Sequence, residues 1–359
     1  MPFERILVFS RLNVNRNAIK AIVVSALLLA INSTFLPANA AGVAKGCVQP
    51  KVQAIDLGKL IVAGQISQVP SVAWGIQAGC FQKYGITVDY KTVASTQIGM
   101  SGLIGGTYDL VLNTPTNLIQ IVGNSGLDLK FIAPRHGYSR AELDRAKKEP
   151  LYPGELLLQS ALIVKKDSPI KSWSDLANKK IAIQSINSAD HAGTLLAIKN
   201  SGGSSKKTQF VVVPSAQMEL TLNKGDVDAV IPNDPFASQI LINGGRIIGY
   251  PNAYYAEPGA AVVYAALSDN VAKKRLAFKA FQKAVLESNK LMNLPENENS
   301  FRDLIATITN VTPQAAAKLR LPVMEEQNLS FSEIAYIPRK LKQVGFTDKR
   351  VNLTPLLFW

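Results

Sequence analysis

The stretch that decides the fold runs from Leu60 to Ala133 and begins LIVAGQISQVPSVAWGIQAGCFQKYGITVDY. It continues KTVASTQIGMSGLIGGTYDLVLNTPTNLIQIVGNSGLDLKFIA. Short apolar runs, LIVAG, ITVDYKTV, TYDLVLN and DLKFIA, alternate here with segments of helical pattern. This alternation predicts strand and helix units whose strands form a parallel sheet through right-handed crossovers.

Small polar residues follow the strands of this stretch. Gln65 and Gln68 stand in the loop after the first strand, Ser95–Thr96 after the second and Asn113–Thr116 after the third. In open α/β sheets, ligands bind beyond the carboxyl ends of the strands, where helix N-termini converge. We therefore expect a binding surface of backbone donors and small polar side chains at this edge.

A second series of such units begins at Lys180. Strand KKIAIQS leads through Ile186-Asn187-Ser188 to the helix ADHAGTLLAIKNSGG, and TQFVVVP, VDAVIP and RIIGY are further strands. GAAVVYAAL, after Pro258, is expected to return to the first lobe. The predicted divisions are a leader, 1–40, a first lobe, 41–160, a second lobe, 161–258, and a return to the first lobe with C-terminal helices, 259–359. These divisions predict a ligand cleft between two α/β lobes.

The first forty residues have a different pattern. Four basic residues precede an apolar run, Ala21–Ile31, and a small-residue site ends at Ala40. This order is typical of a cleavable secretory signal, with cleavage expected near Ala40 and a periplasmic mature chain. An uncleaved membrane anchor is the alternative, but the run is shorter than the roughly 20 residues that span a bilayer.

The chain is strongly basic, with a formal net charge of +13. Removing the four basic residues and Glu4 of the leader leaves +10. Export argues against nucleic acid as the partner of such a chain. An anionic ligand or a negatively charged membrane surface fits better, although net charge identifies no ligand.

Cysteines and histidines are few. In an oxidising compartment Cys47 and Cys80 either form a disulfide or remain two inert thiols. A lipid-anchored Cys47 fits less well, because Lys45 stands where such sites prefer small residues. His136 and His191 are the only histidines, and their spacing offers no cluster of zinc ligands. We expect neither a metal nor another cofactor.

The segment Pro134–Glu155 reads PRHGYSRAELDRAKKEPLYPGE and lacks the periodicity of a core element. We predict a surface insertion, with a short helix near the mouth of the cleft.

The order of these segments resembles a known family. IVAGQ, then GCFQKYGITVDY, SGLIGGTYDLVLNTPT and GLDLKFIA, followed by LIVKKDSPIKSWSDLANKKIAIQSINSADHAGTLLAI, is similar to substrate-binding proteins of ABC importers of the nitrate, sulfonate and taurine group. KGDVDA at 224–229 resembles a recurrent family motif, and the likeness covers about 58–290. Asn178 departs from the glycine usual at its position, and the insertion after Arg135 is unusual.

The resemblance implies a type II periplasmic-binding-protein fold that closes on a small solute, expected to be anionic and of sulfonate or carboxylate type. It implies delivery of that solute to an inner-membrane permease, and we expect a monomer. A receptor that reports to a membrane sensor remains open as an alternative, because no residue distinguishes sensing from transport.

An enzyme is the rival class. The chain has no G-x-S-x-G elbow, and neither histidine has an evident nucleophile partner. A relative of the fold makes a thiamine pyrimidine, but the cysteine cluster which that resemblance requires is missing. We therefore expect a binding protein.

The candidate site residues are polar side chains at strand ends, helix starts and the interlobe crossover. Helix capping is the alternative role for the hydroxyl and amide residues among them. Arg135 is either an anion ligand or an exposed rim arginine, and His191 either a cleft contact or a surface imidazole. Asp190 and Asp234, if they point into the cleft, favour a solute with an amine or hydroxyl. The candidate ligand-binding residues are Gln65, Gln68, Ser95, Thr96, Asn113, Thr114, Thr116, Arg135, Ser185, Asn187, Ser188, His191, Asn233, Asp234 and Tyr255.

Overall fold

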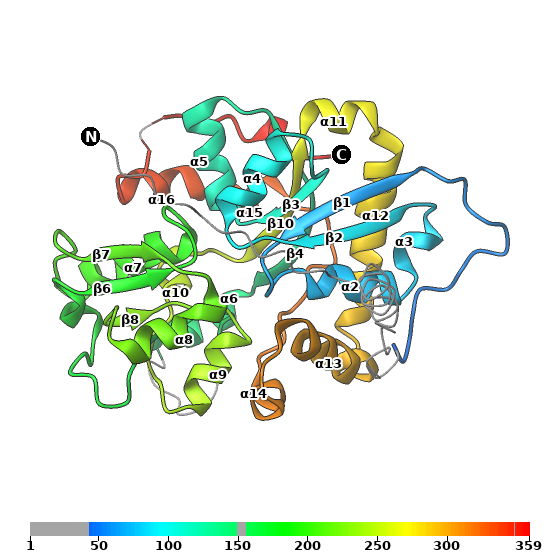
Figure 1. Ribbon diagram of the computed structural model, residues 1–359. Coiled ribbons are helices and arrows are strands. Elements are labelled where there is room, and N and C mark those ends of the chain that lie inside the picture. The colour runs from blue at the N-terminus through cyan, green and yellow to red at the C-terminus, as the bar shows by residue number, and fades with distance from the viewer. Residues whose placement is uncertain (1–42, 149–155, 348) are drawn as a thin grey trace, which may run out of the picture. The chain divides into compact units, whose positions relative to one another are not determined.

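The computed structural model describes residues 43–148, 156–347 and 349–359. The predicted leader, 1–40, lies outside the described residues, as does the last part of the predicted insertion, 149–155. Within the described part, the strands form two five-stranded sheets (Figure 1). We call each sheet with its covering helices lobe I and lobe II, and both belong to one unit, Ala40–Trp359.

The sheet of lobe I has the order β2-β1-β3-β10-β4. Its strands are β1 (Lys59–Gly64), β2 (Thr87–Thr92), β3 (Leu110–Asn113), β4 (Leu129–Tyr138) and β10 (Gly259–Leu267). β1 pairs in parallel with β2 and β3, whereas β10 runs antiparallel between β3 and β4. The return of GAAVVYAAL to the first sheet is as predicted, but the sheet is mixed and not wholly parallel.

The sheet of lobe II has the order β7-β6-β8-β5-β9. Its strands are β5 (Leu162–Val164), β6 (Lys180–Ile183), β7 (Gln209–Val212), β8 (Ala229–Val230) and β9 (Arg246–Gly249). β6 pairs in parallel with β7 and β8, and β5 is antiparallel to β8 and β9. The two sheets therefore repeat one plan. In each, four strands run in one direction, and a strand of the opposite direction lies between the third and the last strand of the order.

The helices follow the strands in the expected alternation. The longer α-helices are α2 (Pro70–Gln77), α4 (Thr96–Ile104), α5 (Pro115–Ser125), α6 (Arg140–Lys148), α7 (Ala189–Asn200), α8 (Ser215–Lys224), α12 (Arg275–Met292) and α13 (Glu298–Thr309). The shorter ones are α3 (Cys80–Lys83), α9 (Phe236–Ile242), α10 (Asn252–Tyr255), α11 (Ser268–Lys273), α14 (Pro313–Lys318), α15 (Phe331–Ile334) and α16 (Ile337–Gln343), with 3-10 turns at Trp173–Leu176, Pro295–Asn297 and Thr354–Leu356. No helix in the described part is both long and apolar enough to cross a bilayer.

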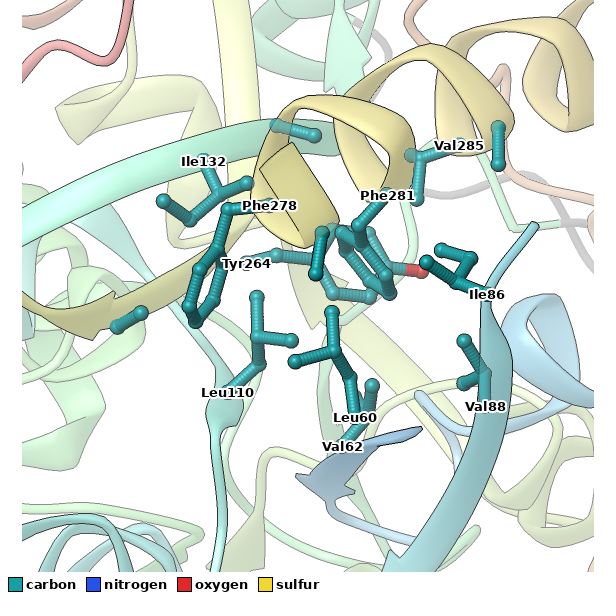
Figure 2. Close-up of a cluster of buried hydrophobic side chains, with 14 of the residues drawn as sticks. Leu60, Val62, Ile86, Val88, Leu110, Ile132, Tyr264, Phe278, Phe281 and Val285 are labelled. Atoms are coloured by element: carbon teal, nitrogen blue, oxygen red, sulfur yellow. The ribbon is translucent and has the colours of Figure 1, made fainter. Parts of the chain in front are cut away.

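The core of lobe I forms where α12 packs on the sheet. Apolar residues recur along α12 at spacings of three and four, which gives the helix one apolar face. From that face Phe278 and Phe281 point toward Leu60, Leu110 and Tyr264 of the strands (Figure 2). The Phe281 ring stacks on Phe81 with centroids 5.4 Å apart. This packing fixes the strand ends from which the polar loops project.

Cys47 and Cys80 form a disulfide, so the alternatives of inert thiols and a lipid-anchored Cys47 do not hold in this structure. The bond joins the segment before β1 to the start of α3. Both cysteines are buried and lie in the cluster around Trp74. The bond therefore holds the N-terminal segment against lobe I.

Asn178 occupies the turn before β6 with a φ of 60°. That left-handed conformation is the one in which glycine is favoured, and asparagine is among the few other residues that adopt it readily. The departure from the family glycine therefore leaves the turn intact.

The predicted surface insertion is wrong over its first residues. Pro134–Tyr138 continues β4 and is buried, and the predicted short helix is α6, which follows it. β4 reaches this far because β10 pairs with it as far as Gly259, opposite Tyr138. The strand thus carries Arg135 and His136 into the interior.

Close packing of α7 against α10 depends on Gly193. A Cβ at this position would lie 2.2 Å from the Pro251 carbonyl oxygen, which belongs to the backbone and has little room to move. We expect Gly193→Ala to lower the free energy of unfolding by about 1–3 kcal/mol, measured by urea denaturation. Gly99→Ala in α4 is the matched control, because its Cβ would meet only ordinary contacts at 3.5 Å and beyond. It should leave stability unchanged or raise it by about 0.5–1 kcal/mol; equal losses in both variants would contradict the argument.

Candidate binding site

A cavity of about 80 Å³ lies among residues of both lobes. Lobe I contributes the loop after β1, the starts of α4 and α5, and the end of β4. Lobe II contributes the loop after β6, the start of α7, the residues after β8, and α10. The predicted site residues that line it are Gln65, Gln68, Thr96, Asn113, Thr114, Thr116, Arg135, Ser185, Ser188, Asn233 and Asp234.

Four predicted site residues lie outside this lining. Ser95 precedes Thr96 at the start of α4, and Asn187 adopts a left-handed φ of 60° before α7. His191 is neither a cleft contact nor a surface imidazole, because its ring is buried between Phe210 and Phe346, with centroid distances of 4.2 and 4.7 Å. Tyr255 belongs to α10 and not to a loop, and it is fully buried against Tyr336.

Three of the predicted residues do cap helices. Ser95 Oγ accepts the Ile98 N–H at 3.3 Å, Thr114 Oγ1 accepts the Asn117 N–H at 3.2 Å, and Ser188 Oγ accepts the His191 N–H at 3.2 Å. Thr114 and Ser188 also line the cavity, one from each lobe. The starts of α5 and α7 therefore present backbone donors and a positive dipole end to the cavity, which favours an anion there.

Arg135 lines the cavity and is buried, with only 4% of its surface exposed. Its Nε donates to the Ser71 hydroxyl at 2.9 Å and to the Gln68 carbonyl at 3.1 Å. Nη1 donates to His136 Nδ1 at 2.8 Å, whereas Nη2 has only a long contact of 3.5 Å with the Ser67 carbonyl. The alternative of an exposed rim arginine is wrong, because β4 carries the side chain inward.

The positive charge of Arg135 has no carboxylate partner among the described residues. Burial lowers its pKa to about 10, so the guanidinium is charged at neutral pH. A guanidinium has five N–H donors in a planar fork that fits two acceptor oxygens, and Arg135 uses only part of them within the protein. Its buried charge is a strong attractor for an anion that enters the cavity.

His136 lies beside this charge as a neutral group. Burial and the adjacent guanidinium hold its pKa well below the usual value. Because arginine can only donate, His136 Nδ1 accepts from it, and the ring proton is on Nε2. The residue lines the cavity together with Tyr138 of the same strand, and the two rings are 6.1 Å apart, edge to face.

Asp190 brings a carboxylate to the cavity from the first turn of α7. Its Oδ1 accepts from the Ser160 hydroxyl at 2.7 Å and from the Asn252 amide at 2.9 Å. No hydrogen bond occupies its Oδ2 within the described residues, and the residue lines the cavity. Burial raises the pKa of Asp190 to about 6, the two hydrogen bonds opposing this only in part.

Asp234 uses both of its oxygens within the protein. Oδ1 accepts the Ser238 N–H at 3.0 Å, and Oδ2 accepts the Arg320 N–H at 2.6 Å. Burial raises its pKa to about 6 as well. Asp234 therefore joins lobe II to the segment after α14, whereas Asp190 retains a free oxygen for a solute.

Sequence reasoning missed several lining residues. The sequence pattern places His136 and Tyr138 in a surface insertion, and no pattern distinguishes Asn252, Glu257 or Tyr336. The lining residues outside the predicted set that carry polar side chains are Ser67, Asn117, His136, Tyr138, Gln159, Gln184, Asp190, Asn252, Glu257 and Tyr336. The Ser67 hydroxyl is buried without a hydrogen-bond partner, so it is free to bind a solute. Among the described residues, no group of three or more His, Cys, Asp or Glu is placed to hold a metal ion.

One family model matches the middle of the chain. Residues 81–246 match the family model "ABC transporter, phosphonate, periplasmic substrate-binding protein". A search of curated proteins finds no match. This match agrees with the resemblance to substrate-binding proteins of ABC importers.

Solved structures show the fold. The alkanesulfonate-binding protein SsuA from Xanthomonas axonopodis pv. citri, bound to MOPS, is similar with a TM-score of 0.65 and 16% identity, over 87% of this chain and 99% of that one. The periplasmic aliphatic sulphonate binding protein SsuA from Escherichia coli gives 0.63 and 18%, over 84% and 92%. The desulfurization enzyme DSZB gives 0.58 and 13%, over 84% and 96%. The type II periplasmic-binding fold predicted from the sequence is confirmed, and an enzyme shares it.

Proposed function

We propose that this chain, with the fold and family match of periplasmic substrate-binding proteins, is the receptor of an ABC importer for a small, singly charged organic anion. The solute is of sulfonate or carboxylate type and binds between the two lobes. The main support is the buried guanidinium of Arg135, which lines the cavity without a carboxylate partner among the described residues.

A single negative charge fits the cavity better than two. Arg135 is the one cation of the lining, while Asp190, Asp234 and Glu257 are carboxylates. Glu257 is paired with Arg140, but the two aspartates repel a second anionic charge on the solute. The free Oδ2 of Asp190 instead favours an amine or hydroxyl on the part of the solute nearest α7.

Binding is coupled to closure in this proposal. Solute contacts come from lobe I through Arg135 and Thr114 and from lobe II through Ser188 and Asp190. A solute stabilises the closed form only through contacts that the open form lacks. Gln97 of α4 already donates to the Ser185 hydroxyl of lobe II at 3.5 Å, a direct contact across the mouth. The closed receptor, a monomer released by cleavage near Ala40, then delivers its solute to an inner-membrane permease.

Titration calorimetry across a matched set of solutes tests this function. The set contains ethanesulfonate, its 2-hydroxy and 2-amino derivatives, the corresponding carboxylates, and ethylphosphonate, which takes a second charge as pH rises. We expect one solute per chain, a preference for single charge, and recovery of the solute unchanged. Weak binding of every anion, or tighter binding of the phosphonate as it gains its second charge, would contradict the proposal.

An enzyme of this fold would consume its ligand. Mass spectrometry of each solute after prolonged incubation with the protein separates the two classes. Conversion of any member of the set would replace the receptor by a catalyst. The two cysteines provide no thiol for such a step, because they are joined to each other.

The cap residues give a further prediction for the cavity. Thr114→Ala and Ser188→Ala each remove a cap hydroxyl, which costs about 1 kcal/mol of stability, and each also removes a donor from the lining. We expect solute affinity to fall about tenfold in the double variant. Ser95→Ala is the matched control, because Ser95 caps α4 without lining the cavity. Ser95→Ala should lose about as much stability as each of the other two substitutions, but no solute affinity. If all variants bind the solute equally well, Thr114 and Ser188 serve only as helix caps.

A further inference from the structure

The outward face of α11 and α12 is a second charged surface, separate from the cleft (yellow in Figure 1). We define it by its exposed basic residues, Lys273, Arg275, Lys279, Lys283 and Lys290, and call it the α12 basic face. Arg275, Lys279 and Lys283 follow one another at intervals of four, so they form one stripe along the helix. None of the five lines the cavity.

The charge of this face is not neutralised within the described chain. The nearby acids are already paired, Asp109 with Lys274 at 2.7 Å and Glu287 with Lys83 at 2.6 Å. Within the described part, no aspartate or glutamate side chain pairs with the five residues of the face. Asp269, in the first turn of α11, is an exposed acid at one edge of the face, and the exposed Glu326 lies beside Lys283 and Lys290 at the other. The face therefore presents a concentrated positive potential to solvent.

Two large apolar side chains stand exposed beside these cations. Leu276 is 69% exposed and Trp359 is 63% exposed. Arg275 connects them. It is the neighbour of Leu276 in the chain, its Nη2 donates to the Trp359 carbonyl at 3.3 Å, and its guanidinium lies over the Phe358 ring at 5.7 Å from the centroid. Exposed tryptophan and leucine among lysines is the pattern of proteins that lie on a bilayer, where the ring enters the headgroup region.

We propose that the α12 basic face binds the surface of a lipid bilayer that carries anionic headgroups. Each basic residue near such a surface adds attraction, and the attraction falls off within a Debye length. Leu276 and Trp359 reach the headgroup layer and add an apolar contact. This contact holds the chain at the membrane whatever solute occupies the cleft, so it does not depend on the proposed function.

Sedimentation with lipid vesicles tests the proposal. The exported protein, with its N-terminus established by mass spectrometry, is mixed with vesicles of phosphatidylglycerol and phosphatidylcholine or of phosphatidylcholine alone. We expect binding to the anionic vesicles only, weakening steeply as salt is raised. The double variant Lys279→Gln, Lys283→Gln should lower the vesicle affinity about thirtyfold, given the attraction expected per basic residue.

Matched variants distinguish this face from the overall charge. Lys206→Gln with Lys207→Gln removes the same charge from exposed positions of lobe II and should leave vesicle binding nearly unchanged. Trp359→Ser should weaken binding without changing its salt dependence. Solute affinity should be equal in all of these proteins. Equal binding to both kinds of vesicle, no binding to either, or equal losses in the two lysine pairs would overturn the proposal.

Discussion

Replacing Arg135 with glutamine is expected to lower the affinity for an anionic solute by about 30- to 5,000-fold. The guanidinium is the one cation of the cavity lining and has no carboxylate partner among the described residues. Loss of a buried charge-assisted contact costs about 2–5 kcal/mol of binding free energy. Arg135→Lys keeps the charge but loses the planar fork, so it should recover only part of the affinity.

Arg135→Gln should not unfold the protein. Glutamine retains an amide donor for the Ser71 hydroxyl and the Gln68 carbonyl, and it removes the cost of burying an unpaired charge. Arg246→Gln is the matched control, because Arg246 also donates to two carbonyls, of Ser168 and Ile170, but lies outside the cavity lining. Calorimetry and urea denaturation of both variants separate the two roles. Unchanged affinity in Arg135→Gln would remove the basis of the anion proposal.

Local pattern was enough to predict most of the sheets. LIVAG, KKIAIQS and GAAVVYAAL became β1, β6 and β10 because each run is buried on both faces, and burial is what an unbroken apolar run indicates. The polar residues at the strand ends were found for a related reason. Thr114 and Ser188 carry a cap signature that depends only on the next few residues, and the strand order then places both at one cavity.

The centre of the site could not be found in this way. PRHGY after DLKFIA has the polarity of a surface loop, and nothing nearby in the sequence predicts its burial. Arg135 is buried by partners far along the chain, since Ser71 and Gln68 precede it by 64 and 67 residues. β4 extends through it because β10, more than a hundred residues later, supplies the pairing strand. A prediction of these contacts requires the topology, which no single segment contains.

Asp190→Asn is expected to weaken the binding of an amine-bearing solute and to raise the stability of the folded protein. Asparagine can still accept through Oδ1 from Ser160 and Asn252, but it has no charge to offer an amine near Oδ2. We expect at least tenfold weaker binding of an amine-bearing anion, while an anion without an amine binds equally well or better. Calorimetry with 2-aminoethanesulfonate and ethanesulfonate measures the difference.

The stability of this variant depends on pH in a defined way. Burial raises the pKa of Asp190 to about 6, so the folded protein holds the proton more tightly than the unfolded chain, where the pKa is near 3.8. Ionisation therefore lowers the free energy of unfolding as pH rises from about 4 to about 6, and the loss persists above that range. Asp190→Asn should be more stable than the natural protein by about 3 kcal/mol at pH 7.5 and no more stable at pH 4.

Asp234→Asn distinguishes a carboxylate that faces the solute from one that only holds the fold. Both oxygens of Asp234 accept backbone N–H groups, from Ser238 and Arg320, and an asparagine NH2 cannot accept the second. The gain from removing a buried charge is therefore offset by an unpaired N–H, and the variant should be no more stable than the natural protein. If Asp190→Asn and Asp234→Asn alter amine selectivity equally, the free oxygen of Asp190 is not what the solute contacts. If neither does, Asp190 serves only to join Ser160 to Asn252.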